Sequence, residues 1–120
     1  MSTSDLQGRL KKETYDQDEV ISFGVFEKGA DPGSYVHVPE SLVSRLIHLG
    51  CAYKLHVIQM IDLYEDIYLN GLQCQSLVEE IRFLGNIIDD QALVESLRPV
   101  MDLLSKIEKN SSLGLKVSGL

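Results

Sequence analysis

The chain has little of what marks the more easily recognised classes of small protein. Its 120 residues include no tryptophan, three prolines and two cysteines, and aromatic residues make up 7%. Bases are also scarce, since 11 lysines and arginines stand against 18 acids, giving a formal net charge of −7. An acidic surface repels phosphates, so we expect no nucleic-acid partner. The same surface fits a basic protein partner, but it also serves solubility alone.

The two cysteines and the absence of long apolar runs bear on location. Cys51 and Cys74 are too far apart for a CxxC motif, and a single domain of this length can build a core without a disulfide. We interpret them as two buried thiols in a reducing compartment. Residues 1–19 are polar and of mixed charge, unlike a secretory signal, and charges interrupt every apolar stretch. The sequence therefore predicts a cytoplasmic protein with no membrane partner.

Recognisable motifs for metals, phosphates and nucleophiles are also missing. His37, His48 and His56 have none of the spacings of a zinc site, and the chain contains no GxSxG, Walker A or GxGxxG sequence. We therefore expect no cofactor and no metal, and the sequence identifies no catalytic residue. A small enzyme that uses groups such as His56 and Asp62 is an alternative, because the fold alone could bring them together.

We expect residues 1–18 to be a flexible segment and residues 19–120 to form a single domain.

Alternating apolar residues predict three strands in this domain. Residues 19–28 form the clearest strand, and a type II turn at Asp31-Pro32-Gly33 would lead into a second strand at 35–38. A third strand at 113–117 would return to this hairpin, although a disordered tail is the alternative.

Helical spacing of apolar residues predicts about four helices between Glu40 and Lys109. The first covers 40–49 and ends at Gly50, and the second covers 53–70. The third runs to Asp89 after a capping box formed by Ser76 and Glu79. The last follows a cap at Asp89 or Asp90 and contains Pro99, so we expect a kink or a local break near Arg98. The predicted fold is α+β, with these helices packed against a small three-stranded antiparallel sheet.

The helix predicted at 53–70 has two unlike sides. Its core side carries an arc of roughly 120°, made of Tyr53, Val57, Met60, Ile61, Tyr64, Ile67 and Tyr68. Its back carries acids together with three aliphatic residues, Leu55, Ile58 and Leu69. Either another helix covers these aliphatics, or they belong to an oligomer or partner surface.

The acids and aliphatics of the back give the functional hypothesis. A non-catalytic protein-binding domain is the leading interpretation, for instance an immunity, antitoxin or inhibitor protein that masks a basic partner. A structural homo-oligomer, such as a homodimer, is the alternative, and the acids could also be separate solvated faces. The candidate partner-binding residues are Asp62, Glu65, Asp66, Leu55, Ile58, Leu69, Asp89 and Asp90.

Overall fold

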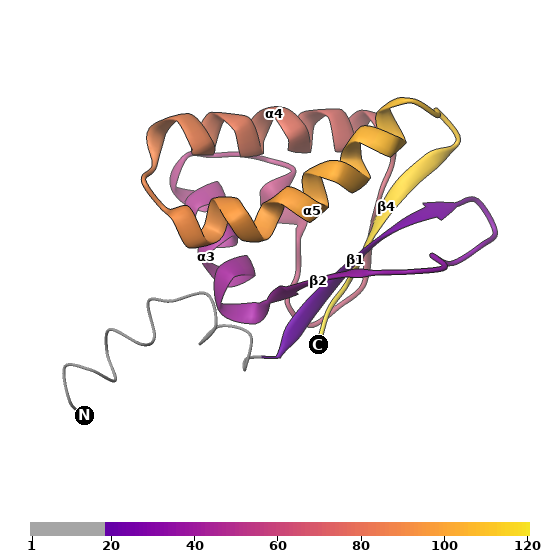
Figure 1. The fold of residues 1–120 in the computed structure, drawn as a ribbon, viewed down its shortest axis with the longest axis horizontal. Coiled ribbons are helices and arrows are strands. Elements are labelled where there is room, and N and C mark those ends of the chain that lie inside the picture. Colours follow the sequence, from indigo (N-terminus) through magenta and orange to yellow (C-terminus); the bar gives the residue numbers. More distant parts are fainter. Residues whose placement is uncertain (1–18) are drawn as a thin grey trace.

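A computed structural model describes residues 19–120 (Figure 1), so the expectation for 1–18 lies outside the described residues. The elements, labelled as in Figure 1, are β1 (Val20–Glu27), β2 (Val36–Pro39), α3 (Glu40–Ala52), the 3₁₀ helix η1 (Ile58–Met60), β3 (Ile67–Leu69), α4 (Gly71–Ile87), α5 (Gln91–Glu108) and β4 (Leu113–Ser118). Figure 1 shows the helices gathered on one side of the strands. The α+β class is as predicted.

The sheet is antiparallel, in the order β2-β1-β4-β3. Its two central strands come from opposite ends of the described chain, with Phe23 of β1 opposite Val117 of β4. Alternate side chains of these strands, such as Ile21, Phe23, Leu115 and Val117, are buried under the helices. The predicted hairpin and the predicted return of the last strand are confirmed.

The predicted numbers of helices and strands are wrong. Over residues 19–120 the sheet has four strands and the chain has three α-helices. Both errors come from the segment 53–70, which contains η1 and strand β3 in place of an α-helix. The apolar residues of this segment contact the core at intervals that match helical spacing by coincidence, so the spacing did not indicate a helix.

A Schellman motif ends α3 and prevents the helix from continuing into this segment. Lys54 has a positive φ of 58°. Its N–H donates to the Cys51 carbonyl at 3.3 Å, and the Leu55 N–H donates to the Gly50 carbonyl at 2.8 Å. These two bonds satisfy carbonyls of the last helical turn. The helix therefore passes the predicted stop at Gly50 and ends at Ala52.

In the segment 53–70, several residues expected in the core are exposed, and two residues expected on the opposite side of the helix are buried. Four residues of the expected core side have large exposed areas: Tyr53, Met60, Tyr64 and Tyr68. Ile58 and Leu69, expected on the back, are 0% exposed. The exchange follows from the backbone, because η1 and a strand present side chains in a different order from an α-helix.

Helix α4 begins earlier than predicted. The Asn70 carboxamide oxygen accepts from the Gln73 N–H at 2.8 Å, and the Gln73 carboxamide oxygen accepts from the Asn70 N–H at 2.9 Å. This reciprocal capping box starts the helix at Gly71, so Ser76 and Glu79 lie inside it. The Asn70-Gly71 pair, read from the sequence as a helix end, is thus a helix start.

Helix α5 follows its prediction most closely. The Asp90 carboxylate accepts from the Leu93 N–H at 3.2 Å and caps the helix. The helix stays continuous through Pro99, so of the two predicted alternatives the local break is absent. Its buried side includes Leu97, Val100 and Leu104, which pack in the core.

The turn after β1 forms at Gly29 and not at Gly33. Gly29 has a φ of +85°, and the Ala30 N–H donates to the Glu27 carbonyl at 2.9 Å. Positive φ at the third corner is what a type II turn requires, and glycine adopts it without steric cost. Pro32 then folds back onto Gly24, where an added Cβ would lie 2.6 Å from the proline Cβ. Glycine at position 24 therefore leaves the room that this close approach needs.

Candidate functional site

The three aliphatic candidates for partner binding do not form a surface. Ile58 and Leu69 are fully buried, and Leu55 is half-buried against the core. The intramolecular cover that the sequence left as an alternative is therefore what the structure contains.

The acids before β3 are held in hydrogen bonds within the chain. Asp62 accepts from the Tyr64 N–H at 2.7 Å and the Glu65 N–H at 3.2 Å, which forms an Asx turn. Asp66 accepts from the Ser118 hydroxyl at 3.0 Å and the Gly119 N–H at 3.2 Å. These bonds tie the loop to the end of β4. Glu65 is exposed.

Asp89 and Asp90 lie in the connection between α4 and α5, away from the loop before β3 (Figure 1). Asp90 caps α5 and forms an ion pair with Arg45 of α3, so it fixes these two helices together. Asp89 is exposed. The predicted acids thus occupy two separate places.

Glu80 has a structural role that the sequence did not reveal. Its carboxylate accepts from the Val57 N–H at 3.1 Å and from the Ile58 N–H at 2.9 Å. The two amides lie at the start of η1, where the backbone has no helical acceptor for them. Glu80 therefore holds the segment after α3 against α4. No local sequence signal connects residues this far apart.

An apolar cluster lies on the exposed side of α4. Tyr53, just after α3, packs against Phe83 with ring centroids 5.8 Å apart in an edge-to-face arrangement. Ile87 follows Phe83 by one helical turn. Tyr53, Phe83 and Ile87 are 46%, 44% and 46% exposed. We call these three residues the Tyr53 cluster, and none of them was a sequence-predicted site residue.

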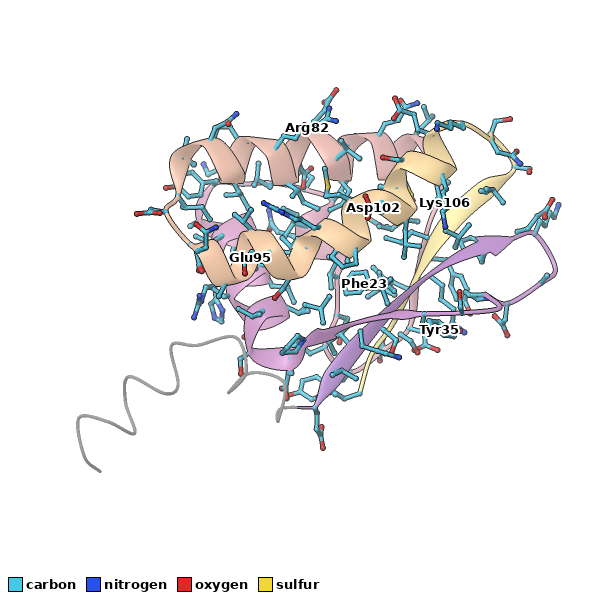
Figure 2. All side chains as sticks on the ribbon, viewed as in Figure 1. Phe23, Tyr35, Arg82, Glu95, Asp102 and Lys106 are labelled. Carbon is cyan, nitrogen blue, oxygen red and sulfur yellow. The ribbon has the colours of Figure 1, made fainter. Side chains whose placement is uncertain are left out.

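A cleft of about 390 Å³ opens where α4 and α5 lie side by side. Eight apolar side chains line it, among them Leu46 of α3, Leu84 of α4 and Leu97 of α5. The charged residues of its lining are both arginines, Arg82 on α4 and Arg98 on α5. Figure 2 shows Arg82 on α4, with Glu95 and Asp102 on α5. His56 and Asp62 do not line this cleft.

A second cleft, of about 300 Å³, continues along the same two helices. Its lining includes Arg82 again, together with the carboxylates Glu79 and Glu108. The electrostatic character between α4 and α5 therefore changes along the helices, from arginine-bordered and apolar to mainly acidic.

Lys116 is the charged group most enclosed by the sheet. It lies on the side of β4 away from the helices, 3.3 Å from the Asp31 carboxylate and 5.6 Å from the Tyr68 ring centroid. Burial alone lowers the pKa of Lys116, but Asp31 and Tyr68 raise it, and the net pKa lies above the ordinary lysine value. The ammonium is a permanent charge that holds the loop after β1 onto the sheet.

The two cysteines differ in environment, contrary to the expected pair of buried thiols. Cys51 is exposed and Cys74 is buried, and neither forms a disulfide. Burial raises the pKa of the Cys74 thiol to about 11. Cys74 therefore remains a protonated packing residue at neutral pH.

The histidines lie apart from one another. His37 is hydrogen-bonded to the Ser22 hydroxyl at 2.9 Å, and His48 donates from Nδ1 to the Ser44 carbonyl at 2.8 Å. Within residues 19–120, no group of three or more His, Cys, Asp or Glu side chains is placed to hold a metal ion.

Comparison of the chain with protein-family models, curated proteins and solved structures finds no match. In the described part of the chain, none of the helices combines the length and apolarity that crossing a bilayer requires.

Proposed function

We propose that this chain is a non-catalytic protein-binding domain whose contact surface is the Tyr53 cluster. The supporting observation is that Tyr53, Phe83 and Ile87 stay nearly half exposed in a domain that buries twenty other apolar side chains. Two aromatic rings in contact at a surface, with an exposed aliphatic side chain one helical turn away, are typical of binding hot spots, where a few such groups supply most of the affinity.

The charges around the Tyr53 cluster suggest the kind of partner. Glu79 lies one turn before Phe83, and Asp89 lies two residues after Ile87; both acids are exposed. Lys54 is a base next to Tyr53. With a net charge of −7 for the whole chain, an apolar surface with a basic rim is the complementary partner.

Masking a basic protein, as immunity, antitoxin and inhibitor proteins do, is the specific form of this proposal. A cytoplasmic location belongs to it, supported by two cysteines that are both free in the structure.

Capture from native extract with matched variants tests the proposal. The bait is the full chain, and the test variant carries Phe83→Asp and Ile87→Asp. Leu72→Asp is the control, because Leu72 is on the same helix and is 75% exposed but lies outside the cluster. We expect a basic protein that the wild type and the control capture and the test variant does not. Thermal unfolding of all three baits checks that they are folded.

Two results would contradict the surface assignment. The first is equal capture by the test variant and the control, and the second is the absence of any partner that depends on the cluster. A Glu79→Lys, Asp89→Lys variant separates charge from apolar contact, since it should weaken capture mainly at low salt.

A homodimer through the Tyr53 cluster is the alternative that keeps the same surface. The mass of the purified chain in solution, measured by light scattering up to high micromolar concentration, distinguishes the two. If the chain forms a dimer and Phe83→Asp abolishes it, the partner of the Tyr53 cluster is a second copy of the chain.

A further inference from the structure

We infer that the cleft between α4 and α5 binds a small amphipathic carboxylate. Its aliphatic chain would lie between the two helices, and its carboxylate would lie between Arg82 and Arg98. Phe83 and Ile87 do not line this cleft, so the site is separate from the Tyr53 cluster and can be tested independently.

The shape and lining favour an aliphatic ligand. The volume of about 390 Å³ is in the lower part of the roughly 300–1,000 Å³ that ligand sites occupy, which favours a small molecule. Apolar side chains from three helices form its walls. Gly85 leaves one wall open, because a Cβ built at this position has no heavy atom within 4 Å. An aliphatic chain would release water from this surface.

The charge of the lining favours a carboxylate at one end. Within the described chain, neither Arg82 nor Arg98 has an ion pair, whereas Arg45 pairs with Asp90 and Lys116 pairs with Asp31. A guanidinium fork matches a carboxylate in shape and charge.

The surrounding acids do not occupy the proposed site. Glu95 and Asp102 lie three and four residues from Arg98, but neither lines the cleft. The adjoining cleft carries Glu79 and Glu108. Those carboxylates would repel an anion, which restricts the ligand's charged end to the arginine-bordered cleft.

Titration of the full chain with decanoate below its micelle concentration tests the inference. Binding is followed by calorimetry and by amide chemical-shift changes. We expect saturable binding of one decanoate, with shifts in α4 and α5. Arg82→Gln and Arg98→Gln should each weaken it about tenfold, as the loss of a charge-assisted contact does. Lys109→Gln is the control, since it removes an exposed positive charge outside the cleft and should bind like the wild type.

Decanol and decyltrimethylammonium test the charge of the ligand, and Gly85→Leu tests the place. Decanol should bind at least tenfold more weakly than decanoate, and the cation more weakly still. Gly85→Leu should abolish binding while the chain stays folded, because Gly85 lines the cleft and an added Cβ there meets no heavy atom within 4 Å.

Three outcomes would overturn the inference. The first is that decanoate shows no saturable binding, the second is that decanol binds with the same affinity as decanoate, and the third is that the arginine variants bind decanoate as tightly as Lys109→Gln does. A concentration-dependent dimer that Gly85→Leu abolishes would assign the cleft to a second copy instead.

Discussion

Two glycines at equivalent positions in two helices should respond in opposite ways to the same substitution. Gly50 is the third residue from the end of α3, and Gly85 is the third residue from the end of α4. Neither has a positive φ. Replacing glycine with alanine in a helix gains about 0.5–1 kcal/mol from propensity alone. The tertiary surroundings of each position decide the sign.

At Gly85 the added methyl group meets nothing within 4 Å. Gly85→Ala should therefore keep most of the propensity gain and stabilise the fold by about 0.5–1 kcal/mol. At Gly50 the added Cβ would overlap the Ile58 side chain, with the Ile58 Cβ at 2.9 Å. Ile58 is fully buried and its N–H is bound to Glu80, so it cannot move away freely. Overpacking of about 1–3 kcal/mol outweighs this gain, so Gly50→Ala should be destabilising by up to about 2.5 kcal/mol.

Thermal and urea unfolding, followed by circular dichroism, measure both variants against the wild type. For a domain of this size, 1 kcal/mol corresponds to a shift of about 4–8 °C, so the two melting temperatures should differ by at least ~4 °C. Equal stability of Gly50→Ala and Gly85→Ala would contradict this prediction. That result would mean that Ile58 does not pack on α3, and the course of the chain after Ala52 would then be wrong.

Three further predictions test the segment that follows α3 and the core beneath it. Lys54→Gly should stabilise the fold by about 0.5–1 kcal/mol in urea unfolding, because glycine adopts the positive φ without strain; a destabilised variant would contradict the Schellman motif. Glu80→Ala should cost about 2–3 kcal/mol, because two backbone N–H groups lose a charged acceptor. Glu79→Ala should change the stability by less than about 0.5 kcal/mol, and equal effects of the two would count against the Glu80 bonds. In a thiol-reagent assay at pH 8, Cys51 should react in the folded chain and Cys74 only after unfolding, since burial raises the pKa of Cys74 to about 11; rapid reaction of both would show that Cys74 is accessible.

The elements predicted well are those whose signals are local. Strand β1 alternates apolar residues, and α5 has an acid at its cap followed by a one-sided apolar stripe. Each signal lies within the element itself, and the core then buries the expected side, as it does for Phe23 and Leu97. Local consistency of this kind is what makes sequence reasoning reliable.

The segment 53–70 failed because its conformation is decided by contacts with distant residues. Its backbone is held by the Glu80 carboxylate, by pairing of β3 with β4, and by bonds from Asp66 to the chain end. The apolar residues touch the core at intervals that happen to match a helix. The sequence shows these intervals but not the distant partners, so a helical pattern put Ile58 on the back of a helix, where its burial could not be decided.

The candidate surfaces were beyond sequence reasoning for the same reason. The Tyr53 cluster joins residues thirty apart in the chain, and the cleft depends on the spacing of α4 and α5. An exposed aromatic residue and a buried one look alike in a sequence. The exposure of a side chain depends on how the whole chain packs, so it cannot be inferred from the residue type at one position.

The sequence by itself determined the acidic charge, the α+β class, the first hairpin and the last helix, because composition and local periodicity carry that information. Only the tertiary structure decided which side of the 53–70 segment is buried, that the acids lie in two places, and that Arg82 and Arg98 share a cleft. These properties arise from contacts between residues far apart in the chain. Their energies exist only once the helices and the sheet have packed together.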